Sequence, residues 1–113
     1  DVARSLAAGE IRRNDRLSGS ICDAIVTPQP GDLTFPILRR LCGPGLAVSE
    51  DEVLRAMALA FRHLRVVIEP GGAVALAAAL FRPEALTGDT AIAVATGGNV
   101  DAALYARALS TLE

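Results

Sequence analysis

Apolar residues recur at helical spacing through the middle of the chain and predict its best-defined helix. Ser49 and Glu52 have the spacing of a capping box, in which the serine hydroxyl accepts from the Glu52 amide and the carboxylate reaches back. Five apolar residues then fall on one helical face: Val53, Ala56, Met57, Ala60 and Leu64. This pattern predicts a helix that begins after Ser49 and runs to Leu64.

The same reasoning predicts four further helices, over residues 1–9, 32–41, 73–81 and 102–112. Gly9 is a stop signal for the first, and Asp32 and Asp101 are N-caps for the second and fourth. Pro36 fits only in a first helical turn. Residues 73–81 are apolar on every side, which predicts a helix that is buried on every side.

Short apolar runs alternate with these helices and predict an α/β fold. Residues 21–26 and 46–48 are candidate strands, and residues 91–95 have the uninterrupted apolar character of a parallel strand covered on both faces. We expect a partial, open, mainly parallel sheet with flanking helices. Two or three strands are too few for a self-sufficient sheet. Residues 1–113 are therefore expected to form a single incomplete domain, with residues before Asp1 removed.

Composition narrows the possible functions. The chain has 113 residues, is 51% apolar and carries a net charge of −2. All 11 basic residues are scattered arginines, so we expect no nucleic-acid partner. No apolar run approaches the ~20 residues of a membrane span. Cys22 and Cys42 lack metal-site spacing and are expected to be reduced and largely buried in a cytoplasmic protein.

The most informative site is the glycine turn at residues 96–101, which follows the predicted buried strand. Ligands of open α/β sheets bind beyond the carboxyl ends of strands. Gly97 and Gly98 would let the backbone approach a flat ligand, and the Thr96 hydroxyl could bond a ring heteroatom. On spacing alone, the favoured interpretation is that the pair serves only to turn a strand into a helix. His63 is expected at the surface.

Five segments, in order, resemble motifs of one enzyme family. Residues 96–101 (TGGNVD) resemble the "SGGN(V/I)D" signature of threonine dehydratases and serine racemases. Further similar segments are residues 68–78, with "EPGGA", residues 48–52, "VSEDE", residues 21–25, "ICDAI", and residues 32–38, "DLTFPIL". Residues 1–9 also resemble the helix that follows the family's metal-binding loop. The chain thus resembles the C-terminal part of a serine/threonine dehydratase of pyridoxal-phosphate (PLP) fold type II.

This resemblance implies four cofactor-binding positions. Thr96 would contact the pyridine nitrogen of PLP, and Gly97 would lie beside the ring. Ala24, which replaces a family glycine, would lie by the ring through its backbone. Glu69 corresponds to a family glutamate near the ring, although a helix-start carboxylate before Pro70 is an equal alternative.

The resemblance also bears on metal binding and catalysis. Asp1 corresponds to the last protein ligand of a divalent cation in serine racemase-like members, but the other ligands would precede it. No catalytic residue is expected, because the chain contains no lysine to carry the cofactor. We therefore expect neither cofactor nor metal to be bound by this chain alone.

The parent protein is expected to be a homo-oligomeric ammonia-lyase. It would remove the β-hydroxyl of a small hydroxy-amino acid to give a 2-oxo acid and ammonia. This chain would be inactive without the missing N-terminal half. A serine racemase-like enzyme is one alternative, and a non-catalytic oligomerisation or regulatory half-domain is another.

Overall fold

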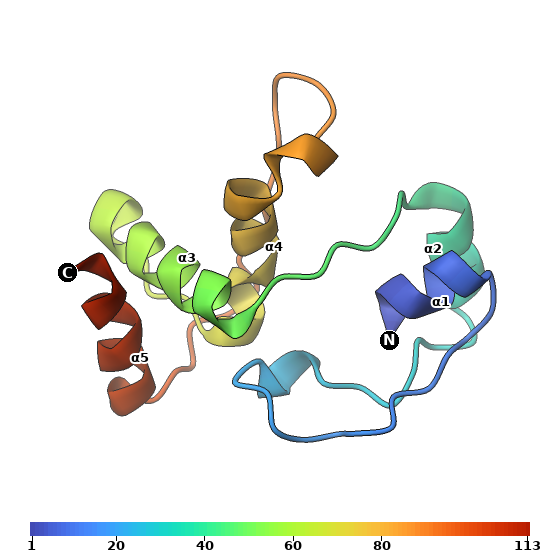
Figure 1. Cartoon of the computed structure of the whole chain (residues 1–113), viewed down its shortest axis with the longest axis horizontal. Helices are drawn as coiled ribbons and strands as arrows, with labels where there is room; N and C mark the ends of the chain where they lie inside the picture. The colour runs from blue at the N-terminus through green and yellow to red at the C-terminus, as the bar shows by residue number, and fades with distance from the viewer. The chain divides into compact units, whose positions relative to one another are not determined.

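The computed structural model describes all 113 residues, which form two compact units. The first unit comprises residues 1–19 and 25–47, and the second comprises residues 20–24 and 48–113. The α-helices are α1 (Val2–Ala8), α2 (Phe35–Leu41), α3 (Glu50–Leu64), α4 (Pro70–Phe81) and α5 (Ala102–Leu109) (Figure 1). Short 3₁₀ turns are η1 (Asp23–Ile25), η2 (Pro83–Ala85) and η3 (Ser110–Leu112). None of the helices is long and apolar enough to span a membrane.

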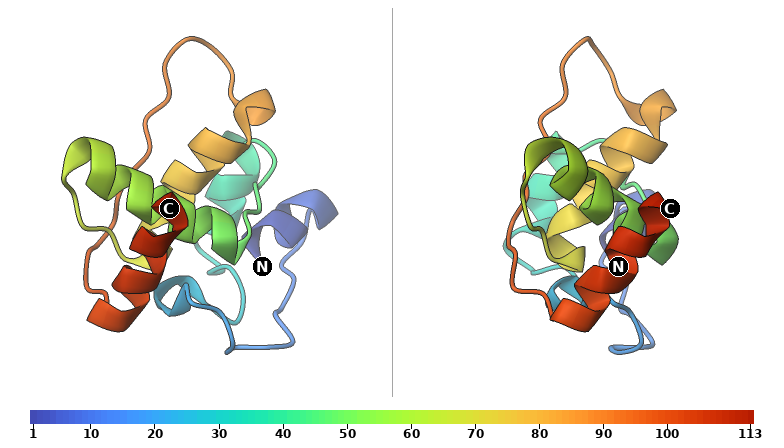
Figure 2. Two further views of the ribbon diagram at one scale, coloured as in Figure 1. Left: turned by 60° about the vertical axis from the view of Figure 1, so that its left-hand side comes forward. Right: turned by 90° about the vertical axis from the view of Figure 1, so that its left-hand side faces the viewer.

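Helix α3 is the centre of the second unit, because both α4 and α5 pack against it (Figure 2). Val53, Leu54 and Met57 are its largest buried side chains, each at most 2% exposed. Burial of each stabilises the unit by about 1.5–3 kcal/mol. Alanines fill the remaining contacts between the helices, and their small side chains allow the helices to approach closely: Ala56 and Ala60 of α3, Ala73 and Ala77 of α4, and Ala108 of α5.

The predicted start of α3 is confirmed in detail. The Ser49 hydroxyl accepts from the Glu52 amide at 3.2 Å, and a Glu52 carboxylate oxygen accepts from the Ser49 amide at 2.7 Å. The helix ends at Arg65, whose φ of 59° lies in the left-handed region. Arg65 is the only non-glycine residue of the chain with positive φ. A side chain there is strained, since this conformation favours glycine.

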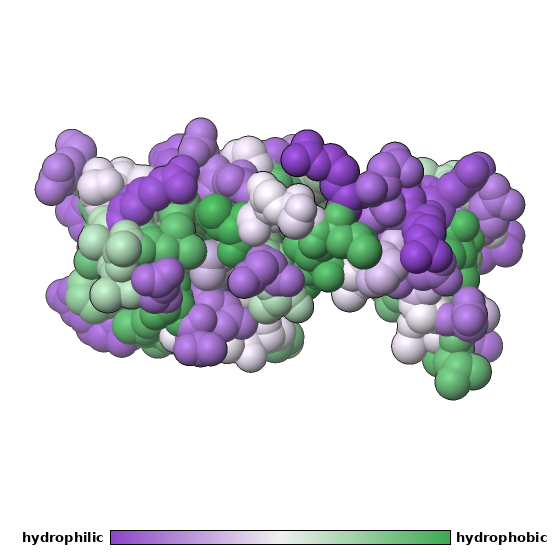
Figure 3. All heavy atoms as spheres, turned by 90° about the horizontal axis from the view of Figure 1, so that it is seen from below, coloured by the Kyte–Doolittle hydropathy of each residue, from purple (hydrophilic) through white to green (hydrophobic).

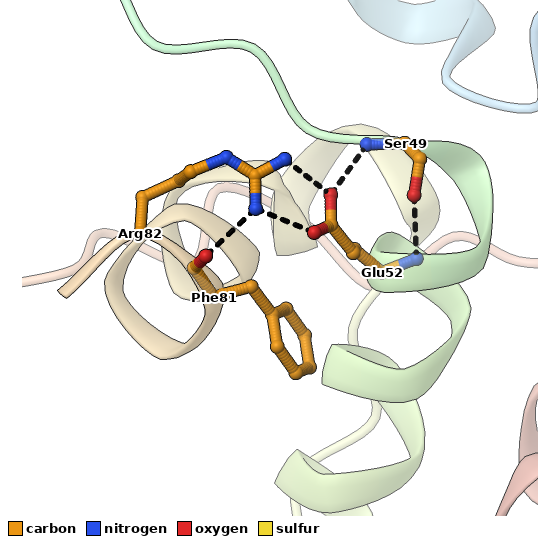
Figure 4. Close-up of polar contacts among 4 residues, drawn as sticks. All are labelled: Ser49, Glu52, Phe81 and Arg82. Carbon is orange, nitrogen blue, oxygen red and sulfur yellow. Dashed lines mark hydrogen bonds and ion pairs between the residues drawn. The ribbon is translucent and has the colours of Figure 1, made fainter. Parts of the chain in front are cut away.

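Glu52 also ties the start of α3 to the end of α4. Arg82 donates from Nη1 and Nη2 to the two Glu52 carboxylate oxygens, at 2.5 and 2.9 Å (Figure 4). Arg82 Nη1 also donates to the Phe81 carbonyl at 2.7 Å. The Arg82 hydrogen bonds, followed by that from the Ser49 amide, lower the pKa of Glu52 to about 2. One carboxylate therefore caps α3 and holds the last turn of α4.

Helix α4 is less covered than its sequence predicts. It begins at Pro70, and its buried residues, Pro70, Gly72, Ala73 and Ala77, lie toward one side. Ala75 is exposed, and Leu80 is 44% exposed. The prediction of burial on every side is wrong, because α4 packs on α3 through one face while its other face is only partly covered.

The predicted parallel sheet is also wrong, because the structure contains helices and no strand. Residues 91–95 do not pair with another segment, and Ile92 and Val94 are 89% and 64% exposed. Figure 3 shows hydrophobic surface interspersed with hydrophilic surface on one face of the molecule. A strand requires a ladder of backbone hydrogen bonds to a neighbour. These apolar runs have strand-like composition, but the chain supplies no ladder to pair them.

Several helix ends differ from the predictions. Residues 21–26 contain the turn η1 instead of a strand, and residues 46–48 are irregular. Helix α2 has Thr34, not Asp32, at its N-cap, while its proline lies in the first turn as predicted. Asp101 occupies the N-cap of α5 without a side-chain bond. Gly9 ends α1 with a φ of 71°, which confirms the predicted stop.

The strained end of α3 gives the first prediction. Arg65→Gly should raise the free energy of unfolding by about 0.5–1 kcal/mol, because glycine adopts the left-handed conformation without steric cost. Arg62→Gly, inside the helix, is the matched control and should lower it by about 1 kcal/mol. Urea denaturation measures both. Equal destabilisation by the two glycines would contradict the assignment of Arg65 as a left-handed cap.

The lowered pKa of Glu52 gives the second prediction. Its folded pKa of about 2 lies below its ordinary value of 4.5, so the ion pair stabilises the fold above pH 4.5. That stabilisation should be lost as the pH falls from 4.5 through about 2. Glu52→Gln should weaken the dependence of the free energy of unfolding on pH over this range. Asp51→Asn, which removes an exposed neighbouring charge but keeps the ion pair, is the matched control and should retain the slope that Glu52 produces. Identical curves for Glu52→Gln and wild type would refute the prediction.

Candidate functional site

The candidate site lies in the second unit, where the start of α4 meets the glycine turn. Ile68 is buried, and Pro70 begins the helix. The Glu69 amide donates to the Gly97 carbonyl at 3.0 Å. This bond joins two segments that lie almost 30 residues apart in the sequence.

The Glu69 side chain reaches the same turn as its backbone. One carboxylate oxygen, Oε2, accepts from the Asn99 amide at 3.1 Å. The other, Oε1, lies 2.7 Å from where a Cβ would stand on Gly97. The half-buried carboxylate therefore occupies the space that a side chain at residue 97 would take.

Two further glycines allow the two backbones to meet. A Cβ on Gly98 would lie 2.7 Å from the Val67 carbonyl oxygen, and one on Gly72 would lie 2.8 Å from the Gly97 carbonyl oxygen. These distances are too short for any side chain. The sequence suggested that Gly97 and Gly98 admit a ligand or simply turn the chain. The structure shows that they admit another part of the chain itself.

Thr96 lies immediately before this turn and is exposed. The Thr96 hydroxyl has no partner among the side-chain hydrogen bonds of the chain. The only side-chain hydrogen bond to the turn runs from the Asn99 amide to the Glu69 carboxylate. The hydroxyl is therefore available both to donate and to accept. A neutral hydroxyl of this kind suits the nitrogen of an aromatic ring.

A third segment, residues 20–24, is fixed by another glutamate. Glu50 Oε1 accepts from the Ile21 amide at 2.9 Å, and the Ser20 hydroxyl accepts from the Cys22 amide at 3.1 Å. Ala24 lies in η1 and is exposed. Its φ is not positive, so alanine replaces the family glycine there without backbone strain.

A hollow of about 370 Å³ joins residues of these segments in the second unit. Three carboxylates line it, those of Asp23, Glu69 and Asp101. The structure thus brings Glu69 to the hollow, while Thr96, Gly97 and Ala24 are not among its lining residues. Its remaining lining residues are Ile21, Pro70, Asn99, Val100 and Leu104.

Asp1 has a structural role in the first unit that the sequence analysis missed. Its Oδ1 accepts from the Val2 amide at 2.8 Å and caps α1. Its Oδ2 accepts from the Thr27 hydroxyl at 2.8 Å. No group of three or more His, Cys, Asp or Glu side chains in the chain is arranged to hold a metal ion. The carboxylate is thus already used by the chain.

The cysteines and the histidine do not line the hollow. Cys22 is buried, and burial raises the pKa of its thiol. Cys42 is exposed, so the prediction of burial is wrong for that residue. His63 is exposed on the last turn of α3, as predicted. Glu50 was not singled out from the sequence, because the Ile21 amide that it binds lies 29 residues earlier in the chain.

Comparison with known proteins identifies the family. Residues 1–97 match the model of the family described as "Pyridoxal-phosphate dependent enzyme". The chain belongs to this family. It is 38% identical over 101 residues to a beta-hydroxyaspartate dehydratase of Paracoccus denitrificans, covering 89% of the chain and 31% of that protein. It is 35% identical over 114 residues to a serine racemase of Dictyostelium discoideum, covering 97% and 35%.

A solved structure agrees with this assignment. The crystal structure of a threonine deaminase from T.th. has a TM-score of 0.79 and 37% identity, covering 89% of this chain and 36% of that one. The chain spans about a third of the length of the curated relatives it matches. Members of this family depend on PLP, and an exposed neutral hydroxyl beside a backbone turn fits its pyridine nitrogen.

The glycine contacts give the third prediction. Gly98→Ala and Gly72→Ala should each lower the free energy of unfolding by about 1–3 kcal/mol, because the new Cβ meets a backbone carbonyl that cannot move cheaply. Gly97→Ala should cost less, since it displaces only the flexible end of Glu69. Gly43→Ala, which meets no atom within 4 Å, is the control. Equal urea midpoints for Gly98→Ala and Gly43→Ala would refute the close contact.

Proposed function

We propose that this chain is the cofactor-ring side of a PLP-dependent dehydratase that acts on 3-hydroxy amino acids. The observation that carries the proposal is the Thr96 hydroxyl, which is exposed and unpaired immediately before a turn held by Glu69. Thr96 would bond the pyridine nitrogen. Gly97 and Glu69 would form the backbone and side-chain support beside the ring, and Ala24 would approach the ring through its backbone.

PLP, when bound, supplies an electron sink for negative charge at the substrate α-carbon. A neutral hydroxyl at Thr96 cannot keep the ring nitrogen protonated as a carboxylate would. The resulting sink is weaker, which suits β-elimination, because loss of a leaving group relieves the charge at once. The residues of this chain therefore favour elimination over reactions that must store that charge.

The substrate class is supported by the names of the relatives. They are called a beta-hydroxyaspartate dehydratase, a serine racemase and a threonine deaminase, and their named amino acids all carry a β-hydroxyl. We expect loss of that hydroxyl as water, which leaves an enamine. The released enamine tautomerises to an imine, and water hydrolyses the imine to a 2-oxo acid and ammonia. Serine racemisation is a second candidate activity, supported by the Dictyostelium relative.

The complete reaction needs groups that this chain does not have. Covalent attachment of PLP requires a lysine amine, and the sequence contains no lysine. The lysine would come from the rest of a longer, homo-oligomeric cytoplasmic protein. We therefore propose that the 113-residue chain has no activity by itself.

This proposal gives the fourth prediction. The complete protein should bind PLP with visible absorbance and release ammonia and a 2-oxo acid from threonine, serine or 3-hydroxyaspartate. Thr96→Ala should weaken PLP binding about tenfold, the cost of one lost hydrogen bond. Thr96→Ser, which keeps the hydroxyl, is the matched control and should behave like wild type.

Two results would contradict the proposal. One is deamination of these amino acids by the 113-residue chain alone. The other is a complete protein that binds no PLP. Interconversion of L- and D-serine without ammonia release would favour the racemase.

A further inference from the structure

Glu69 stands between the start of α4 and the turn that carries Thr96. We infer that Glu69 is a positioning residue, which fixes the 96–99 turn so that the Thr96 hydroxyl faces the cofactor nitrogen. The inference rests on the proposed function and assigns Glu69 a role through the protein backbone. This positioning role is distinct from a role in which the Glu69 carboxylate contacts the cofactor ring directly.

Two hydrogen bonds from this one residue enclose the turn. The Glu69 amide donates to the Gly97 carbonyl at 3.0 Å, and its carboxylate accepts from the Asn99 amide at 3.1 Å. The bonded groups lie on either side of Gly98, so together they restrict the backbone rotation of that glycine. The carboxylate bond is charge-assisted and is the stronger kind.

The available space also favours this role. Oε1 of Glu69 lies 2.7 Å from where a Cβ of residue 97 would stand, so a side chain at residue 97 would displace the carboxylate from the turn. The only side-chain hydrogen bond to the turn is the one from the Asn99 amide to Glu69. Within the turn itself, the Val100 amide donates to the Gly98 carbonyl at 3.0 Å. Loss of the carboxylate leaves Glu69 only the bond from its amide to the Gly97 carbonyl. The turn is then held on one side of Gly98 instead of on both.

A single neutral hydroxyl must be held accurately to be useful. Functional groups need placement within about 0.5 Å and 10–20° of the productive geometry. Thr96 is exposed and has no side-chain bond to hold it within the chain. Its placement therefore depends on the backbone of the turn, and through that backbone on Glu69.

A double-mutant cycle on PLP affinity tests the inference in the complete protein. Thr96→Ala and Glu69→Ala should each raise the dissociation constant of PLP about tenfold, the cost of one hydrogen bond. The double variant should bind no more weakly than Thr96→Ala alone, because both changes remove the same contact. Glu69→Gln, which keeps an acceptor oxygen for the Asn99 amide, should restore binding to within about threefold of wild type.

Glu50→Ala is the matched control, since Glu50 holds the Ile21 amide in the same way but does not touch the turn. Its effect on PLP affinity should multiply with that of Thr96→Ala. Amide hydrogen exchange gives a second readout: Glu69→Ala should speed exchange of the Asn99 amide about tenfold, while Glu50→Ala should leave it unchanged.

The outcomes separate this inference from the proposed function. If wild type binds PLP but the effects of Thr96→Ala and Glu69→Ala multiply to about a hundredfold, Glu69 does not act through Thr96 and the inference is overturned. Unchanged Asn99 exchange in Glu69→Ala would overturn it as well, and thermal melts show whether each variant is folded. A wild-type complete protein without PLP binding would overturn the proposed function, and the inference with it.

Discussion

Direct contact between two backbones, at residues 67–72 and 97–98, determines how the second unit is built. Gly72, Gly97 and Gly98 leave no Cβ between the two segments, and the Glu69 carboxylate fills the remaining space. The contact places the start of α4 against the turn that leads into α5. Both helices then pack on α3, whose buried apolar face forms the core.

Each end of α4 is held by a glutamate. At its start, Glu69 binds the glycine turn through the Asn99 amide. At its end, Arg82 forms two hydrogen bonds to Glu52, which also caps α3. These polar anchors fix both ends of a helix whose own residues are almost all apolar. They leave the Thr96 hydroxyl open, which links the packing of the unit to its proposed role beside a cofactor.

Features that depend on residues close together in the sequence were predictable, and contacts between distant residues were not. The capping box and apolar period gave α3, and Gly9 gave the end of α1, because each depends on residues within one helical turn. The sheet failed because composition shows that a segment can form a strand, but pairing depends on neighbours. Thr96 was singled out both from the glycine turn and from resemblance to a family, and Glu69 from the resemblance. The reason for Gly97 was missed, because the atom its Cβ would strike belongs to a residue 28 positions earlier.

Membership in the PLP-dependent family and the geometry of the turn lead to one account, in which a carboxylate holds a backbone and the backbone holds a hydroxyl. A crystal structure of the complete protein with PLP tests this most directly. The account predicts that the Asn99 amide remains bonded to Glu69 and that the Thr96 hydroxyl lies within hydrogen-bonding distance of the pyridine nitrogen. A Glu69 carboxylate turned away from an unchanged turn, or a ring nitrogen bonded by another residue, would contradict it.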